Sequence, residues 1–341
     1  MWGAPLYSLL RPLLFSLDPE TSHSLALALA GLAGLAFPKP PPAPVRVMGI
    51  DFQNPVGLAA GLDKQAEHVD ALAALGFGFV ELGGVTPRPQ AGNAKPRMFR
   101  LPEARALINR FGLNSVGVEA FTQNLGRARS RMKAGTVIGV NIGKNRDTPN
   151  ERAAEDYERC LEAVYAHVHY VTLNVSSPNT TGLRDLQSEA ALAGIVQALS
   201  RKRQRLRDRH GRNVALVLKI APDLDDAALE GIAGVARRER LDAVMATNTT
   251  VSRQGVEGLP HAGEAGGLSG APLFARSTQV LKSLSSRLKG EVPLIGVGGI
   301  MSGEDARAKF AAGAALVQIY SGLIYRGPGL IAECVSAYRK S

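Results

Sequence analysis

Polar residues end several short apolar segments of this 341-residue chain, and their side chains could bind a cofactor. Asn141, Asn174 and Lys219 each close such a segment. The other segment ends are Thr247 with Asn248, Gly298-Gly299 and Tyr320-Ser321. Amide and ammonium groups can bind a ring that carries carbonyl oxygens and ring nitrogens, and a flavin presents both. The pattern therefore predicts a cofactor site formed by these segment ends.

The loop Asn174–Thr180 carries the leading candidate for proton transfer. Its sequence, Asn-Val-Ser-Ser-Pro-Asn-Thr, is dense in hydrogen-bonding groups, and Pro178 restricts its backbone. Ser177 lies between two asparagines that could help to position its hydroxyl. A serine in a loop is more often a turn residue, so this role depends on the loop lying at a binding site.

Two glycine-rich stretches could bring the backbone close to a phosphorylated ligand. Gly296–Ile300 lies at the end of the seventh apolar segment, and Met301–Asp305 has the composition of a helix start. Glycines let backbone N–H groups approach a phosphate, and a helix N-terminus favours negative charge. Gly266–Gly270 predicts a second loop of close approach. Together with the polar segment ends, these stretches indicate a phosphorylated cofactor.

Histidine and cysteine show no spacing typical of a metal site, and we expect no metal. None of the six histidines ends an apolar segment. His167 and His169 alternate before one such segment and are expected to pack at a strand edge. Cys160 and Cys334 are too few for a disulfide framework, a cysteine-rich zinc site or a cysteine-ligated iron–sulfur cluster.

Eight short apolar segments alternate with helical patterns, which explains how the polar ends could meet. They are 56–60, 79–83, 137–141, 170–174, 215–219, 243–247, 294–297 and 316–320. Near-continuous apolar strands with helices between them are typical of an α/β protein with a parallel sheet. A doubly wound sheet is the alternative, but the eightfold count favours a (β/α)₈ TIM barrel, which collects the C-terminal strand ends into one site. Val45–Phe52, before the first strand, predicts a hairpin.

Residues 1–37 predict a short N-terminal pair of helices. Pro5 and Pro12 bound one apolar stretch, and Asp18-Pro19 has the form of an N-cap followed by proline at the first helical position. Residues 38–44 are rich in proline and predict a stiff linker. The expected domains are therefore the helical pair 1–37, the linker 38–44 and a catalytic barrel over 45–341.

The second helix of this pair is too short to span a membrane, yet more apolar than packing on one face requires. Its apolar run from Leu25 to Phe37 would cover about 20 Å, against about 30 Å for a bilayer's hydrocarbon core. Asp18 and Glu20 precede the run where a signal peptide carries positive charge. We expect the two helices to lie in a membrane interface, with packing onto the barrel as the alternative.

The formal net charge of +10 raises the question of an anionic partner. The densest basic run, 201–212, is expected to be the solvated face and end of a helix, with Gly211 near its C-terminus. Only 5% of the residues are aromatic, which argues against stacking platforms for single-stranded nucleic acid. We expect no nucleic-acid partner, whereas the charge favours an anionic lipid surface.

Eight segments resemble motifs of the quinone-dependent, class 2 dihydroorotate dehydrogenases, in the same order along the chain. They are Ala59–Lys64, Val85–Gln90, Asn141–Asn145, Asn174–Thr180, Lys219–Asp223, Thr247–Thr250, Gly266–Gly270 and Ile295–Ile300. The resemblance implies oxidation of (S)-dihydroorotate to orotate in pyrimidine synthesis, with one FMN per chain as hydride acceptor and a membrane quinone as final electron acceptor. It also implies a monomer bound peripherally at the cytoplasmic face of the inner membrane.

The same resemblance gives roles to individual residues. Those that would bind FMN are Ala60, Gly61, Leu62, Asp63, Lys64, Gly84, Asn141, Asn174, Lys219, Thr247, Gly270, Gly299, Tyr320 and Ser321. Those that would bind substrate are Lys64, Asn109, Arg110, Phe111, Gly112, Leu113, Asn174, Asn179, Asn248 and Thr249. Ser177 occupies the position of the catalytic base, and His23, Arg100 and Tyr320 lie beside the quinone tunnel. Gly84 departs from the family, which usually has a hydroxyl residue contacting FMN there.

Two features separate the subclasses of this family. Class 1 relatives have cysteine where this chain has Ser177, and they lack the N-terminal helices. An FMN-dependent 2-hydroxy-acid oxidase is the alternative enzyme, but it needs a histidine base at a late strand end, where this chain has none. A membrane-associated, non-catalytic barrel is a further alternative, and a flavin absorbance spectrum would argue against it.

Overall fold

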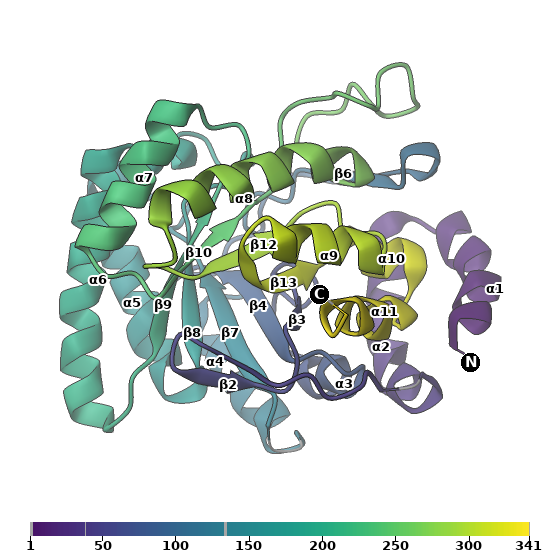
Figure 1. Ribbon diagram of the computed structural model, residues 1–341, viewed down its shortest axis with the longest axis horizontal. Coiled ribbons are helices and arrows are strands. Elements are labelled where there is room, and N and C mark those ends of the chain that lie inside the picture. The colour runs from purple at the N-terminus through teal and green to yellow at the C-terminus, as the bar shows by residue number, and fades with distance from the viewer. Residues whose placement is uncertain (1–2, 38, 133–134, 341) are drawn as a thin grey trace.

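The computed structural model describes residues 3–37, 39–132 and 135–340, and its centre is a closed barrel of eight parallel strands (Figure 1). In barrel order the strands are β3 (Val56–Leu58), β4 (Phe79–Val85), β7 (Val137–Ile142), β8 (Tyr170–Asn174), β9 (Ala215–Ile220), β10 (Ala243–Ala246), β12 (Leu294–Val297) and β13 (Ala314–Ile319). Pairing of β13 with β3 closes the ring. Each strand overlaps one of the predicted apolar segments, so the predicted (β/α)₈ barrel is confirmed.

Aromatic rings fill the N-terminal part of the barrel, and glycines on neighbouring strands make room for them. A Cβ on Gly57 of β3 would lie 2.2 Å from the ring of Phe79 on β4. A Cβ on Gly139 of β7 would lie 2.0 Å from the ring of Tyr170 on β8. Phe52 packs edge-on against Phe79, with ring centroids 5.3 Å apart. This packed layer closes the N-terminal end, and the space for a ligand lies at the opposite end.

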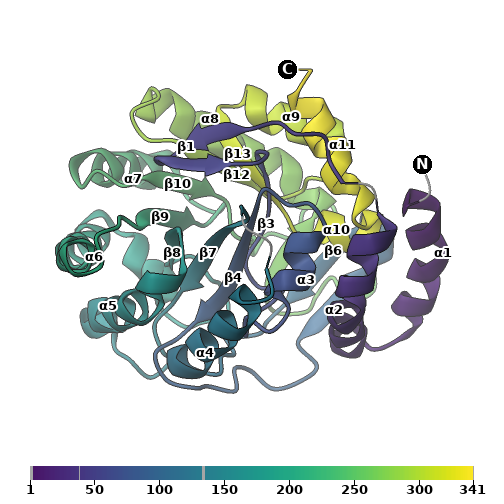
Figure 2. The ribbon, with the colours of Figure 1, turned by 90° about the horizontal axis from the view of Figure 1, so that it is seen from below.

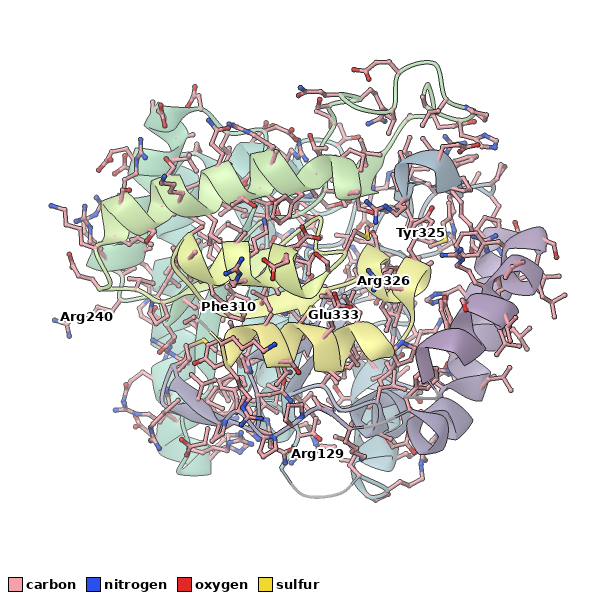
Figure 3. The ribbon with its side chains drawn as sticks, turned by 45° about the vertical axis from the view of Figure 1, so that its right-hand side comes forward. Arg129, Arg240, Phe310, Tyr325, Arg326 and Glu333 are labelled. Carbon is pink, nitrogen blue, oxygen red and sulfur yellow. The ribbon has the colours of Figure 1, made fainter. Side chains whose placement is uncertain are left out.

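Helices surround the barrel and bury their apolar faces against the strands (Figure 2). They are α3 (Val69–Ala74), α4 (Val118–Arg129), α5 (Ala153–Val164), α6 (Glu189–His210), α7 (Asp226–Arg238), α8 (Phe274–Leu288), α9 (Gly303–Ala311), α10 (Ser321–Arg326) and α11 (Gly329–Tyr338). The 3₁₀ turns are η1 (Pro102–Ala104), η2 (Asn150–Arg152), η3 (Tyr165–His167), η4 (Leu183–Gln187) and η5 (Ala271–Leu273). The basic run forms the end of α6, which stops at the left-handed Gly211 as predicted. Arg326 and Glu333 join α10 to α11 through an ion pair of 3.0 Å (Figure 3).

Two small sheets lie outside the barrel. The predicted hairpin is present as β1 (Val45–Val47) and β2 (Ile50–Phe52). A three-stranded antiparallel sheet consists of β5 (Met98–Leu101), β6 (Ala106–Asn109) and β11 (Gly267–Gly270). The prediction of a loop over Gly266–Gly270 is therefore wrong, because this stretch pairs as a strand with β6, where Gly267 lies opposite Asn109.

The N-terminal helices α1 (Gly3–Ser16) and α2 (Pro19–Ala36) lie beside the barrel, with α2 between α1 and α3 (Figure 2). Asp18 caps α2 as predicted and accepts hydrogen bonds from the N–H groups of Glu20 and Thr21. The first helix, α1, continues past Pro12 to Ser16, and Pro12 is exposed on its surface.

Several leucines on these two helices face water. Leu9 and Leu13 are 77% and 66% exposed, and Leu10, Leu25 and Leu29 are also exposed. Within the described ranges, no helix combines the length and apolarity needed to cross a bilayer. Residues 1–2 and Pro38, which belong to the predicted helical pair and linker, lie outside the described residues.

Candidate active site

A cavity opens at the C-terminal end of the barrel, where the strand ends converge. Its wall includes all the polar segment ends considered above: Asn141, Asn174, Lys219, Thr247, Asn248, Gly298, Gly299, Tyr320 and Ser321. The wall also includes Ala60, Gly61, Lys64, Gly84, Asn109, Phe111, Gly112, Leu113, Ser177, Asn179, Thr249 and Gly270. The barrel thus brings together residues that are up to 263 positions apart in the sequence, from Ala59 to Gly322.

A chain of side-chain amides crosses the floor of this cavity. The carboxylate of Glu81, fully buried on β4, accepts a hydrogen bond from Nδ2 of Asn141 at 3.0 Å. Asn141 Oδ1 in turn accepts one from Nδ2 of Asn174 at 2.9 Å. Asn174 Oδ1 then accepts one from Nδ2 of Asn248 at 3.3 Å and another from the hydroxyl of Ser176. The chain ties β4, β7, β8 and the loop after β10 into one rigid floor.

Ser177 lies at the edge of this floor and is 8% exposed. Its Oγ accepts a hydrogen bond of 3.3 Å from the backbone N–H of Asn179. The hydroxyl of Ser177 can therefore still donate a hydrogen bond or transfer its proton. The side chain of Asn179 donates to Oδ1 of Asn109 at 3.1 Å. The loop Asn174–Thr180, which we call the serine loop, therefore also contacts β6. A hydroxyl held in this way can exchange a proton with a ligand in the cavity.

Two lysines place positive charge in the cavity wall. Lys219 is the next-to-last residue of β9 and is buried, which lowers the pKa of its ammonium, while Glu81 partly opposes the shift. Burial also lowers the pKa of Lys64 to about 8, an effect that Arg97 reinforces and Glu20 opposes. The Lys64 ammonium lies 5.1 Å from the centroid of the Phe111 ring. Cations in a site of low polarity attract a carboxylate or a developing negative charge strongly.

Gly298 and Gly299 form a tight turn after β12, with φ values of +111° and +78°. A Cβ on Gly299 would lie 2.4 Å from the backbone of Phe274, so only glycine fits there. The expected contribution of the following helix is not supported. Two N-terminal donors of α9 already have partners, because the N–H of Gly303 donates to Glu333 and the N–H of Asp305 donates to Ser302. The turn lines the cavity, whereas residues 301–305 do not.

Residues 43–337 match the family model for dihydroorotate dehydrogenase. The chain is 57% identical over 338 residues to a dihydroorotate dehydrogenase (quinone) from Thiobacillus denitrificans, covering 97% of this chain and 98% of the relative. It is 58% identical over 338 residues to a protein of the same name from Burkholderia cenocepacia, covering 97% of each. The chain belongs to the dihydroorotate dehydrogenase family.

Solved structures agree with this family membership. The barrel superposes on a ligand-free dihydroorotate dehydrogenase from Eimeria tenella with a TM-score of 0.87 and 39% identity, covering 94% of each chain. The same enzyme crystallised with ferulenol gives a TM-score of 0.88 at 38% identity, covering 94% of this chain and 90% of the other.

Five residues to which the family resemblance gives a role lie outside the cavity wall. They are His23, Leu62, Asp63, Arg100 and Arg110. Arg110 points to the loop between β10 and β11, residues 247–266, which we call the outer loop, and forms an ion pair of 2.5 Å with Glu264 there. Arg100 donates to the carbonyls of Phe15 and Leu17, both at 3.0 Å, so it holds the turn between α1 and α2. The Asp63 carboxylate accepts from the N–H groups of Glu67 and His68.

A second cavity lies between α2 and the loop after β3. His23, Leu62 and Asp63 line it, and Lys64 and Tyr320 line both cavities. Burial lowers the pKa of His23, mainly by removing the imidazole from water. Burial raises the pKa of Tyr320 to about 12, so its hydroxyl stays neutral. The second cavity therefore approaches the first from the side that carries the N-terminal helices.

The sequence analysis gave no individual role to several residues of the site, although Ala59, Pro178, Ser269, Val297 and Ile300 lie in stretches that it singled out. The additional residues in the wall are Ala59, Pro178, Ser269, Leu273, Val297, Ile300, Gln318, Ile319 and Gly322. Glu81 and Gln318 are polar residues inside apolar strands, and that signal could have identified them. Ser269 lies in the predicted Gly266–Gly270 stretch, but its contact with Ser321 at 2.9 Å depends on the pairing of β11 with β6. No histidine is among the described residues that line the cavity, so a histidine-based hydroxy-acid oxidase lacks its base here.

Proposed function

We propose that this protein oxidises (S)-dihydroorotate to orotate, using one FMN as hydride acceptor and a membrane quinone as final electron acceptor. The observation that carries the proposal is the position of Ser177 in the same cavity as Lys64 and the chain of amides. Family membership and the quinone-dependent relatives support it. The reaction would belong to pyrimidine synthesis.

The cavity has the donor set that an FMN requires. Lys219, Asn141 and Asn174 offer an ammonium and amides to a ring of carbonyls and nitrogens. Gly298 and Gly299 expose backbone close to the ligand space, which suits a phosphate. The residues of the cavity wall that would hold FMN are Ala60, Gly61, Lys64, Gly84, Asn141, Asn174, Lys219, Thr247, Gly270, Gly299, Tyr320 and Ser321. Leu62 and Asp63 do not line the cavity, so they would support the residues of its wall without touching FMN.

Gly84 would meet the cofactor through its backbone. A Cβ at this position would lie 3.0 Å from Leu113 and 3.1 Å from Oδ1 of Asn141. A larger residue would therefore press on the amide chain that forms the floor. The departure from the family pattern at Gly84 leaves this chain undisturbed.

The substrate would lie between Lys64 and the serine loop. Its carboxylate would pair with Lys64, and its amide-like ring would bond to the side chains of Asn109, Asn174, Asn179 and Asn248. The stretch Phe111–Leu113 and Thr249 would complete this side of the pocket. Arg110 would act by holding the outer loop through Glu264, not by touching the substrate.

Ser177 would take the proton from C5 of dihydroorotate while the C5–C6 double bond of orotate forms. When bound, FMN supplies the acceptor for the hydride that leaves C6. A serine hydroxyl is a weak base, so it needs a fixed position and a path that removes its proton. Lys219, buried beside the amides, would stabilise the negative charge that accompanies reduction.

The N-terminal helices would bring quinone to the second cavity. Tyr320 and His23 line that cavity, and Arg100 holds the turn between the helices. The exposed leucines of α1 and α2 would enter one leaflet, and the net positive charge would favour an anionic surface. We further propose residues 1–37 as a membrane and quinone module, 38–44 as linker and 45–341 as catalytic barrel. The protein would be a peripheral monomer on the cytoplasmic face of the inner membrane.

A spectroscopic experiment tests this function. Purified protein should show a flavin absorbance spectrum, and heating should release FMN rather than FAD. Anaerobic dihydroorotate should bleach the spectrum, and a quinone should restore it. Protein without flavin, or a flavin that dihydroorotate leaves oxidised, would overturn the proposal.

A further inference from the structure

One arginine side chain connects the loops that follow three neighbouring barrel strands. Arg184 lies in η4, seven residues after Ser177. Its Nε donates to the carbonyl of Ser176 at 3.2 Å, and its Nη2 donates to the carbonyl of Thr249 at 3.0 Å. Its Nη1 donates to the carboxylate of Asp223 at 2.8 Å. The guanidinium thus joins the loops after β8, β10 and β9.

Asp223 extends the connection on its other side. Its carboxylate accepts a hydrogen bond from the hydroxyl of Thr250 and one of 3.2 Å from the backbone N–H of Val251. The side chains of Arg184 and Asp223 are both 23% exposed, so water only partly screens the ion pair. A planar guanidinium with donors in a fixed fork defines the directions of its acceptors more tightly than an ammonium can.

The groups held by Arg184 lie directly beside the proposed chemistry. The Ser176 carbonyl belongs to the peptide bond that leads into Ser177. The hydroxyl of Ser176 accepts from Nδ2 of Asn248 at 3.0 Å, and Asn248 precedes Thr249. Arg184 itself is absent from the cavity wall. It can therefore act on a ligand only through the loops that it connects.

We infer that Arg184, paired with Asp223, is a positioning residue that sets Ser177 against the Asn248–Thr249 side of the substrate pocket. The inference rests on the proposed function, because it concerns proton transfer from dihydroorotate to Ser177. A weak base depends strongly on its placement, and a displacement of about 1 Å can cost about 100-fold in rate. The Arg184–Asp223 pair reduces that displacement without contacting the reacting atoms.

The test separates the two half-reactions of the flavin-loaded enzyme. Arg184→Lys keeps the positive charge but cannot reach three acceptors at once. Reduction of the flavin by dihydroorotate should slow by roughly 10-fold to 100-fold. Reoxidation of the reduced flavin by quinone should keep the wild-type rate, since it does not involve Ser177. Asp223→Asn should slow the same half-reaction, and the double variant should be little slower than either single variant.

Arg276→Lys is the matched control. Arg276 donates to the carbonyls of Pro222 and Leu224, which flank Asp223, but it has no hydrogen bond to the serine loop. Because this variant leaves both members of the Arg184–Asp223 pair in place, flavin reduction should stay within about twofold of wild type. The spectrum of bound flavin and the melting temperature report whether each variant is folded.

Three outcomes would decide the matter. A purely structural role would lower the melting temperature of Arg184→Lys while the loaded enzyme is still reduced at the wild-type rate, and that result would overturn the inference alone. Equal slowing in Arg276→Lys would overturn it as well. A wild-type flavin that dihydroorotate cannot reduce would instead overturn the proposed function, and this inference with it.

Discussion

Nδ2 of Asn174 donates a hydrogen bond of 2.9 Å to Oδ1 of Asn141, and a buried carboxylate determines which way both amides point. A carboxylate can only accept, so Glu81 fixes Nδ2 of Asn141 toward itself. Oδ1 of Asn141 must then face Asn174, and Oδ1 of Asn174 must face Asn248. The donors and acceptors offered to a ligand are therefore set by a residue that does not line the cavity.

Replacing Glu81 tests this dependence. The carboxylate accepts from Asn141, from the hydroxyl of Tyr170 at 3.1 Å and from Gln318 at 2.7 Å. Glu81→Ala leaves these buried donors without an acceptor, and we expect a loss of about 3–5 kcal/mol in the free energy of unfolding, measured in urea. FMN affinity should fall as well. Glu155→Gln, which alters an exposed pair with Arg152, is the control and should change neither quantity.

Lys64 predicts a pH dependence of ligand binding. Its pKa of about 8 means that the ammonium carries its charge below pH 8 and loses it above. The carboxylate of orotate needs the charged form, so the dissociation constant for orotate should rise about tenfold per pH unit above 8. A titration followed by flavin absorbance measures it. Lys64→Met should bind weakly and show a flat profile from pH 7 to pH 9, and a retained slope in that variant would argue against this assignment.

Exposed leucines predict the strength of membrane association. Leu9 and Leu13 are mostly exposed, so replacing both with glutamine should leave the fold intact. Each leucine buried in lipid contributes up to about 1.5–3 kcal/mol, so partition into anionic vesicles should fall on the order of 100-fold. Activity with a small soluble dye as acceptor should stay unchanged.

The barrel itself offers a control for this experiment. Val251 is 53% exposed at the mouth of the barrel, far in sequence from the two helices. Val251→Gln should bind vesicles like wild type. If the two leucine substitutions had no more effect than Val251→Gln, the helices would not be the membrane contact.

The barrel and most of the cavity could be predicted because their signals are local. Each strand is a nearly continuous apolar run, and Asn141 and Lys219 are polar residues one position before the C-terminal ends of their strands. In a closed parallel barrel, the C-terminal ends of all the strands meet at one end of the barrel. The same logic explains why Glu81 was overlooked, since it lies inside a strand rather than at its end.

The features that were predicted wrongly or missed depend on distant partners. Gly267 is in a strand because it pairs with Asn109, 158 positions earlier, and four-residue strands carry little pattern of their own. The N-terminus of α9 lies outside the cavity wall, and Glu333 of α11 accepts a hydrogen bond from its first residue, Gly303. The side chain of Arg110 does not line the cavity, because it pairs with Glu264 on the outer loop. Tertiary contacts determine these strand pairings and side-chain positions, and the spacing of residues along the chain does not reveal them.

Rapid anaerobic mixing of the flavin-loaded protein with dihydroorotate tests the central claim most directly. Ser177→Ala should retain FMN and be reduced slower than wild type by several orders of magnitude, because the cavity then lacks its proton acceptor. Ser177→Cys should recover part of the rate, since a thiolate is the better base. If Ser177→Ala were reduced as fast as wild type at neutral pH, Ser177 would not be the base and this account of the site would be wrong.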